Sequence, residues 1–386
     1  MSPEGSPGPR AIVVTLDACG VGALPDAADY GDAGACTLPH LAEAVGGLRL
    51  PVLEALGLGS IVSMLGVATP EPRAVHGRLA PSGPGKDSTT GHWELMGRPA
   101  PVAPPTYPQG FPSDVVARLE DRIAQRFCCN RPYDGIGAIE DFGEHHLATG
   151  DLILYTSQDS VLQVAAHPDV LGEQDLHAAC VAIREELTGE HAVGRVIARP
   201  FAGDPGAFER TPGRRDFAVP PPGETVLDTL CDAGVEVHGV GKISDLFAGR
   251  GISECHSAPG NPEALAVTSA LLDDLDTGMI FTNLIDTDQV YGHRKDVEGF
   301  HAALREIDAT VGEWLDGLRG GDLLILTADH GCDPAAPHTD HTREYVPLLA
   351  VGPGVAPRRH DGAMGDVGAT VLRWLTGRVS FGRTFA

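Results

Sequence analysis

The sequence predicts an α/β fold, with a mostly parallel sheet flanked by helices and an inserted α/β cap domain. Three observations support this prediction. Short apolar runs that end in Asp or Gly recur along the chain, helical patterns lie between several of them, and two Pro-rich stretches interrupt the series. Strands that alternate with helices are typical of a parallel sheet covered on both faces.

The predicted strands are short runs of apolar residues bounded by turn-forming residues. A strand that is buried on both faces needs no alternation of polar and apolar side chains, so continuous runs favour the interior of a parallel sheet. The runs are Ala11–Leu16, Leu152–Tyr155, Val235–Val240, Met279–Leu284 and Leu323–Leu326.

The clearest predicted helix extends from Phe300 to Leu318. Its apolar residues are spaced alternately four and three positions apart, which places them in one stripe along a helix. Two further helical segments are expected over Asp114–Phe127 and Gln174–Leu187.

The two Pro-rich stretches divide the chain into domains. Residues 98–105 and 219–223 have the composition of semi-rigid connectors. They enclose a segment with helical patterns of its own. We therefore expect a core domain built from residues 1–100 and 221–386, interrupted by a substrate-binding cap of residues 101–220.

Composition and charge exclude several classes of function. The chain has 386 residues, of which 42% are hydrophobic and 21% charged, as in soluble globular proteins. Its 53 acidic and 28 basic residues give a net charge of −25, which disfavours nucleic acid as a partner. No apolar run approaches the roughly 20 residues of a membrane span, and Met1–Arg10 lacks the pattern of a signal peptide. We expect a cytoplasmic protein with no membrane partner.

The eight cysteines form no Cys-x-x-Cys pair and no regular framework. In a long, cytoplasmic chain they are expected to be reduced thiols. Nothing in the sequence requires a dimer, so we expect a monomer.

Acidic and imidazole side chains follow three of the predicted strands. Any one of them alone would be explained as a turn residue, a helix cap or a packed histidine. Parallel strands bring their carboxyl ends to one sheet edge, however, so the set is expected to converge. Six such groups are too many for one tetrahedral site and fit two divalent ions, Mn²⁺ or Zn²⁺, with Mg²⁺ as a further alternative. The six are Asp17, Asp288, His293, Asp329, His330 and His341.

A second group of polar residues lies in the loop GKDSTTGHWE, residues 85–94. Asp87 follows Lys86, so the loop is not a Walker A motif, which requires Ser or Thr there. It offers three consecutive hydroxyls at Ser88, Thr89 and Thr90. A hydroxyl bound to a divalent ion loses its proton more readily and becomes a nucleophile. A plain Ser/Thr turn is the alternative explanation.

These motifs closely resemble those of the phosphopentomutases in the alkaline phosphatase superfamily. The resemblance runs from about residue 11 to the C-terminus. It rests on Asp17 and on the segments GKDSTTGHWE (85–94), YTSQDSVLQVAAH (155–167), VGRVIARPF (193–201), ERTPGRRDF (209–217), GKISD (241–245), DTDQVYGHR (286–294), TADHG (327–331) and TDHTREYVPLL (339–349).

The resemblance implies an alkaline-phosphatase-like core and a role for each residue of the site. One Mn²⁺ would be held by Asp288, His293 and His341, and a second by Asp17, Asp329 and His330. Ser88 matches the nucleophile that becomes phosphorylated, although the family pattern has Thr there. A shifted loop would place the nucleophile at Thr89 or Thr90. Substrate-binding roles fall on Ser157, Asp159, Arg195, Arg210 and Lys242.

The implied activity is an isomerase that interconverts ribose 1-phosphate and ribose 5-phosphate, and the 2-deoxyribose pair. It would work through phosphoserine and a bisphosphate intermediate, with a sugar bisphosphate as the activator that first phosphorylates the enzyme. The alternatives are a cofactor-independent phosphoglycerate mutase or a plain phosphatase on the same core, and a metal-binding protein that has lost catalysis. The cap motifs favour the pentose phosphate substrate, and the complete ligand set argues against lost catalysis.

Overall fold

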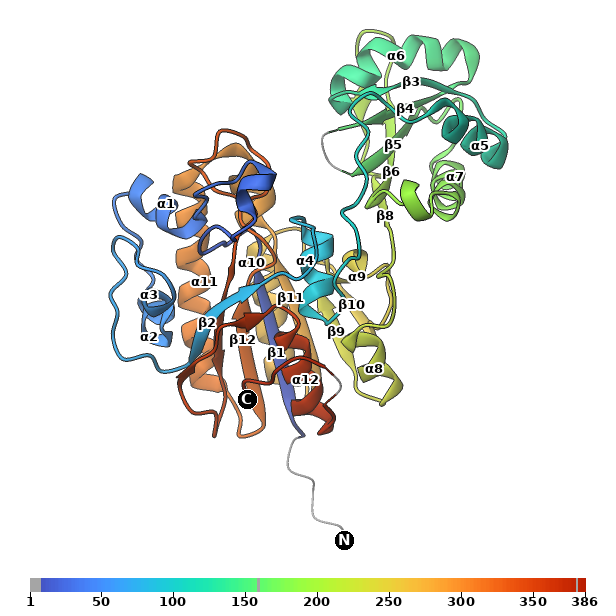
Figure 1. Cartoon of the computed structure of the whole chain (residues 1–386). Coiled ribbons are helices and arrows are strands. Elements are labelled where there is room, and N and C mark those ends of the chain that lie inside the picture. The colour runs from blue at the N-terminus through green and yellow to red at the C-terminus, as the bar shows by residue number, and fades with distance from the viewer. Residues whose placement is uncertain (1–7, 158–159, 380) are drawn as a thin grey trace. The chain divides into compact units, whose positions relative to one another are not determined.

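The computed structural model of the chain describes residues 8–157, 160–379 and 381–386 (Figure 1). The chain divides into two compact units. The first is built from both parts of the chain that flank the second, up to Val102 and from Pro221 onward, and the second spans Ala103–Pro220. Each unit has its own sheet. Within the described ranges, no helix combines the length and the apolar character that crossing a bilayer requires.

The sheet of the first unit has nine strands among the described residues. Its central strands β11, β1 and β12 are mutually parallel and almost wholly buried, so both of their faces are covered. The predicted parallel sheet is confirmed, although the pairings β12–β13 and β13–β2 are antiparallel. In spatial order the strands are β10 (Glu254–His256), β9 (Val237–Val240), β11 (Gly278–Leu284), β1 (Arg10–Leu16), β12 (Asp322–Thr327), β13 (Val346–Val351), β2 (Val75–Ala80) and β14 (Arg358–Arg359), and β15 (Gly362–Ala363) also pairs with β2.

Helices surround this sheet (Figure 1). Helix α10 packs on β11 and α12 on β1. The predicted apolar stripe is present on helix α11, where the residues buried along one side include Phe300, Leu304, Ile307 and Val311. The helical elements are η1 (Ala27–Tyr30), α1 (Thr37–Ala44), α2 (Pro51–Leu56), α3 (Leu58–Ile61), α4 (Ser88–Leu95), α8 (Val226–Asp232), α9 (Ile243–Leu246), α10 (Asn261–Asp274), η3 (Thr287–Tyr291), η4 (Gly292–Arg294), α11 (Val297–Gly317) and α12 (Asp366–Thr376).

A buried ion pair fixes the amino-terminal ends of two central strands. Arg10 begins β1 and donates to both carboxylate oxygens of Asp322, which begins β12, over 2.8 and 2.7 Å. The same guanidinium donates to the carbonyls of Leu272 and Leu275 at the end of α10. Both charged side chains are 1% exposed, and these hydrogen bonds offset the cost of their desolvation.

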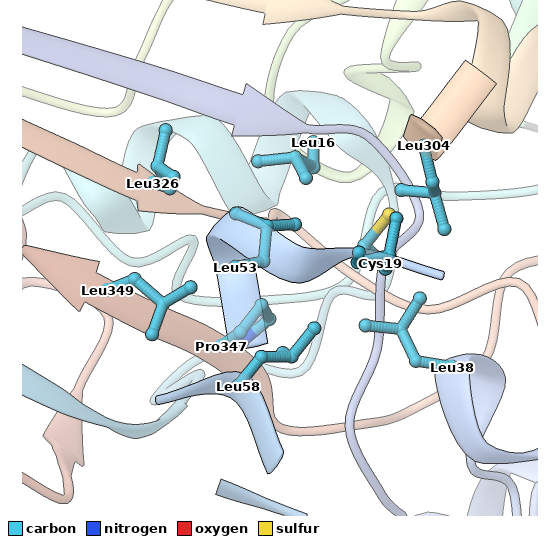
Figure 2. A pocket seen from close by; sticks show the side chains of 10 residues that line it. Leu16, Cys19, Leu38, Leu53, Leu58, Leu304, Leu326, Pro347 and Leu349 are labelled. Carbon is cyan, nitrogen blue, oxygen red and sulfur yellow. The ribbon is translucent and has the colours of Figure 1, made fainter. Parts of the chain in front are cut away.

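A small apolar cavity lies where α1, α2 and α11 approach the sheet (Figure 2). It measures about 10 Å³, which is at most the space of a single water molecule. Nine of its ten lining residues are Leu or Pro, and the tenth is Cys19, whose side chain is buried. Because it offers no polar partner, this cavity is a packing gap rather than a ligand site.

The described part of the second unit contains a mixed sheet of six strands. The pairs β3–β4 and β5–β6 are parallel, and the pairs β4–β5, β6–β7 and β6–β8 are antiparallel. Its elements are α5 (Ser113–Ile123), β3 (Phe127–Pro132), α6 (Gly135–Thr149), β4 (Leu152–Thr156), β5 (Val161–Ala166), α7 (Glu173–Glu186), η2 (Gly189–His191), β6 (Arg195–Ala202), β7 (Glu209–Arg210) and β8 (Arg215–Ala218).

This second sheet has an apolar cluster on each face. Along β4, Leu152 and Leu154 join the cluster that contains residues of α5 and α7, whereas Ile153 and Tyr155 join the cluster that contains residues of α6. Successive side chains of a strand point to opposite faces, so this division follows directly from the strand geometry. The second unit therefore has a core of its own.

One predicted helix is too long. The pattern favours a helix over Asp114–Phe127, but α5 ends at Ile123 and Phe127 already belongs to β3. The chain leaves the helix at Ala124, whose φ of 53° lies in the left-handed region. The predicted state of the cysteines is confirmed, because all eight are free thiols.

Candidate metal centre

The carboxyl ends of β1, β11 and β12 deliver the predicted acidic and imidazole groups to one edge of the first sheet. Leu16 pairs with Leu284 and Thr15 with Thr327, so the three strands end at almost the same level. Asp17 follows β1 directly. The remaining five lie just beyond β11 or β12: Asp288 in η3, His293 in η4, and Asp329, His330 and His341 on the segment between β12 and β13.

His341 reaches this edge because the chain folds back on itself. Gly331 and Thr342 form an antiparallel bridge, with N–H···O distances of 3.3 and 2.7 Å. The bridge brings His341 back beside His330, and the centroids of their rings are 4.0 Å apart. Eleven residues of sequence separation thus become a direct contact.

The six residues form two trios. In the first, the distances are 3.4 Å from Asp288 Oδ1 to His293 Nε2, 3.3 Å from Asp288 Oδ1 to His341 Nε2, and 3.2 Å between the two imidazole nitrogens. Donors that bind one tetrahedral ion at about 2.0–2.2 Å lie about 3.4 Å apart. The first trio therefore has the spacing of a metal site.

The second trio has the same spacing and deeper burial. His330 Nε2 lies 3.4 Å from Asp17 Oδ1 and 3.3 Å from Asp329 Oδ2. All three residues are 3% exposed. One donor atom of each lies within 4.8 Å of the others.

The carboxylate oxygens that face the trios have no hydrogen-bond partner. Asp17 Oδ1, Asp288 Oδ1 and Asp329 Oδ2 are buried, and each is unsatisfied. An unsatisfied buried carboxylate oxygen is costly, and three of them in one place indicate a site for cations. The donor set of carboxylates and imidazoles fits a divalent ion in each trio.

The other atoms of the ligands are held by hydrogen bonds. Asn283 Nδ2 donates to Asp17 Oδ2 over 2.9 Å, and the backbone N–H groups of Ala18 and His330 donate to Asp329 Oδ1. The Nδ1 atom of His330 lies 3.1 Å from the Gly331 carbonyl, which it reaches as a donor. Partners of this kind fix the orientation of metal ligands and leave one atom of each turned to the metal.

His293 is oriented in the same way. Its Nδ1 lies 2.6 Å from the carbonyl oxygen of Thr339, which can only accept, so Nδ1 carries the proton. In the neutral ring Nε2 is then the unprotonated nitrogen, and it points to Asp288 and His341. This is the tautomer that a metal ligand needs.

Electrostatics shift the pKa of Asp17 in the opposite direction to those of Asp288 and Asp329. Burial raises the pKa of Asp17 well above its ordinary value, and the neighbouring carboxylates of Asp329 and Asp288 raise it further. Of the three carboxyl groups, Asp17 is therefore the one that binds a proton most readily.

The two other carboxylates stay ionised. Burial raises the pKa of Asp288, but the imidazoles of His341 and His293 outweigh burial and leave it well below the ordinary value. Burial also raises the pKa of Asp329, but the neighbouring imidazole of His330 outweighs burial and lowers the pKa to about 2.

Ser88 brings a side-chain hydroxyl to the donor atoms of the second trio. It begins α4, and its Oγ lies 3.1 Å from His330 Nε2. The side chain of Asp87 caps this helix by accepting from the Thr90 N–H, and Thr90 Oγ1 donates to Asp87 over 2.7 Å. The hydroxyl of Thr90 is thus used in the cap, whereas that of Ser88 faces His330 of the second trio.

Comparison with known proteins decides the family. The chain is 48% identical over 367 residues to a phosphopentomutase of Caldanaerobacter subterraneus subsp. tengcongensis, covering 94% of this chain and 93% of that protein. It is 50% identical over 344 residues to a phosphopentomutase of Carboxydothermus hydrogenoformans, covering 89% of each. The chain belongs to the phosphopentomutase family.

Membership makes the chain an enzyme of the isomerase class, an intramolecular phosphotransferase. The pattern of the Metalloenzyme superfamily matches residues 9–377, which agrees with use of a divalent metal. Among solved structures, the PH0037 protein from Pyrococcus horikoshii has the same fold, with a TM-score of 0.50 and 15% identity over 97% of this chain and all of that chain. The predicted alkaline-phosphatase-like fold is thereby confirmed.

Sequence reasoning missed several supporting residues of this phosphopentomutase-family site. Asn283 holds Asp17, and Thr287 Oγ1 donates to the Asp17 carbonyl over 2.7 Å. His92 is buried on α4, where its Nδ1 lies 2.8 Å from the Ser88 carbonyl and 3.3 Å from Asp329 Oδ2. The only available signal was their position in or beside the family motifs.

The five predicted substrate-binding residues are divided between the two units. Lys242 precedes α9 in the first unit and donates to Gln289 Oε1. In the second unit, Ser157 follows β4 and Arg210 ends β7. Arg195 begins β6, and its Nη1 lies 3.5 Å from Asp216 Oδ2. Asp159 lies outside the described residues.

Proposed function

We propose that this chain interconverts ribose 1-phosphate and ribose 5-phosphate, and the corresponding 2-deoxyribose phosphates, through a phosphorylated Ser88. The observation that carries the proposal is the position of Ser88 Oγ, 3.1 Å from His330 at the edge of two trios with unsatisfied carboxylate oxygens. Relatives that are 48% and 50% identical over most of the chain and are named phosphopentomutases support the choice of substrate.

In the proposed reaction, phospho-Ser88 transfers its phosphoryl group to the free hydroxyl of a pentose monophosphate. The product is a pentose 1,5-bisphosphate and a free Ser88 hydroxyl. The other phosphate of the bisphosphate then returns to Ser88, which releases the isomeric monophosphate and restores phosphoserine. No phosphate is lost in the cycle. A sugar bisphosphate would supply the first phosphoryl group.

Two divalent ions, for which we propose Mn²⁺, would be held by the two trios. When bound, they neutralise charge on the transferring phosphoryl group and lower the pKa of the serine hydroxyl. The first ion would be held by Asp288, His293 and His341. The second would be held by Asp17, Asp329 and His330.

We propose that the second unit binds the phosphate of the sugar. Arginines gather there around the buried hydroxyl of Tyr155, although the chain as a whole is strongly acidic. Burial raises the pKa of Tyr155, and the positive charges of Arg199, Arg210 and Arg214 oppose that effect. Guanidinium groups bind phosphate through paired hydrogen bonds, so this local charge suits a sugar phosphate. Ser157 and Arg195 belong to the same proposed surface, and Asp159 and Lys242 complete the proposed set.

The reaction is tested with Mn²⁺ and a trace of sugar bisphosphate. Ribose 1-phosphate and 3-phosphoglycerate are supplied in parallel, and free phosphate is followed in both. Ribose 5-phosphate is expected to form without release of phosphate. Release of phosphate in place of the isomer would identify a phosphatase, and conversion of 3-phosphoglycerate would identify a different mutase. Either result would refute the proposal.

Variants of the hydroxyl loop test the nucleophile. Ser88→Ala is expected to lower kcat by on the order of 10⁴-fold or more, as when the nucleophile of other enzymes is removed. Ser88→Thr keeps the hydroxyl and is expected to retain turnover. Thr89→Val, which removes the adjacent hydroxyl, serves as the matched control. Covalent phosphate is followed by intact-mass spectrometry. Its loss in Thr89→Val but not in Ser88→Ala would move the nucleophile to Thr89.

A further inference from the structure

A third cluster of metal-ligating side chains lies in the first unit, away from the two trios. His238 is on β9, and Glu254 and His256 are on the neighbouring strand β10. His238 pairs with Ile280 of β11, four residues before the end of that strand at Leu284. At about 3.3 Å per residue, the cluster is about 13 Å along the sheet from the catalytic edge.

Strand geometry places the three side chains together. In the parallel pair β9–β10, Glu254 is the direct partner of His238. His256 is two residues beyond Glu254, so both point to the same face of the edge strand β10. Cys255, between them, points to the opposite face.

The three donor atoms form a compact triangle. Nδ1 of His238 lies 3.0 Å from Nε2 of His256, and Oε2 of Glu254 lies 3.8 Å from the first nitrogen and 3.9 Å from the second. The equidistant point in the plane of the three atoms is about 2.1 Å from each, which matches the Zn–N and Zn–O bond lengths of protein sites.

The surroundings also fit a metal ligand at His238. If Nδ1 binds an ion, Nε2 must carry the proton of the neutral ring. That Nε2 is buried without a hydrogen-bond partner, and the nearest carboxylate oxygen, Oε2 of Glu236, lies 3.7 Å away. A carboxylate behind a ligating histidine is a common means of orienting it.

The geometry points to a zinc site formed by His238, Glu254 and His256, which would join the edge strand β10 to β9. Two imidazoles and one carboxylate favour Zn²⁺ over Mn²⁺, because nitrogen-rich sites bind the later divalent metals more tightly. The side chain of Glu254 is 64% exposed and that of His256 25%, so the ion has access from solvent and water can complete its coordination.

This inference is independent of the proposed mutase reaction, because none of the three residues belongs to the trios or to the substrate set. The alternative explanation for the short distance between the two histidines is a hydrogen bond rather than a shared metal ion. Two neutral imidazoles 3.0 Å apart can share an N–H···N hydrogen bond, and the cluster would then bind no metal.

The test is the zinc content of the full chain after equilibrium dialysis against Zn²⁺ alone. His256→Ala and Glu254→Gln are each expected to bind one zinc ion fewer per chain than the wild type, with unchanged mutase activity in Mn²⁺. Both changes are on the exposed side of an edge strand, so the fold should tolerate them. Cys255→Ser is the matched control on the same strand and is expected to keep the full zinc content.

Crystals grown with Zn²⁺ provide the second measurement. An anomalous peak among the side chains of His238, Glu254 and His256 is the expected result. Equal zinc content in wild type and both ligand variants, with no peak at this position, would overturn the inference and leave the mutase proposal untouched. Loss of zinc in Cys255→Ser would overturn the assigned ligand set.

Discussion

Asn283 offers a sharp test of how the second trio is organised. It lies at the end of β11 and is 1% exposed, and its Nδ2 donates to Asp17 Oδ2 over 2.9 Å. The bond leaves Asp17 Oδ1 turned to His330. Asn283→Leu keeps a side chain of similar size but removes the donor, so the carboxylate of Asp17 is free to rotate away from the metal position.

The expected effect is on metal affinity rather than on folding. Loss of a hydrogen bond that orients a metal ligand weakens binding about 10- to 100-fold, which is about 1.4–2.7 kcal/mol. Asp17 Oδ2 loses its donor in a buried position, which destabilises the fold, but removal of Asn283 Oδ1, which is already buried without a partner, offsets part of that cost.

The assay is a titration with Mn²⁺ in which free ion is followed by electron paramagnetic resonance. Thr282→Val is the matched control, since Thr282 is the preceding residue on β11 and its Oγ1 is hydrogen-bonded to Thr268 over 2.7 Å. It removes a buried hydrogen bond on the other face of the strand and is expected to leave both metal sites intact. Equal affinities in Asn283→Leu and wild type, or equal weakening in both variants, would refute the reasoning.

Two other predictions follow from the described contacts. Because the pKa of Asp17 is raised well above its ordinary value, metal binding to the second trio is expected to release a proton. The apparent affinity for the metal is then expected to fall up to tenfold per pH unit below that pKa. Calorimetry in buffers of different ionisation enthalpy measures the release. No proton release at any pH would contradict it. Arg10→Met leaves the Asp322 carboxylate buried and unpaired, so unfolding in urea should show a loss of about 3–5 kcal/mol, whereas Arg118→Met at an exposed ion pair should lose at most about 1 kcal/mol.

The elements that the sequence predicts well are those with a single strong cause. Strands β1, β11 and β12 are continuous apolar runs because both of their faces are covered, and α11 shows a regular stripe because one side is buried. The strand β2, with the sequence VHGRLA, has no such pattern. The end of α5 could not be predicted either, because the residues after Ile123 favour a helix and only the left-handed backbone at Ala124 ends it.

The site shows the same division. Convergence of Asp17, Asp288 and Asp329 follows from parallel strands that end at one level, which a sequence pattern can indicate. The contributions of Asn283 and His92 depend on which face of β11 or α4 turns to Asp17 and Asp329. The sequence does not show which polar residue of a buried segment will contact these carboxylates. Such residues emerge only when the contacts of each ligand are traced.

The two trios are attached to the fold in different ways. Asp17 and Asp329 leave the ends of central strands at once, so their release requires the sheet itself to come apart. His341 depends on the short bridge between Gly331 and Thr342, and the side chain of His293 is 36% exposed. Local opening of that returning segment would free one ligand while the sheet stays whole. We therefore expect an ion held by the first trio to exchange more readily than one held by the second, two of whose residues directly follow central strands or lie two residues beyond them.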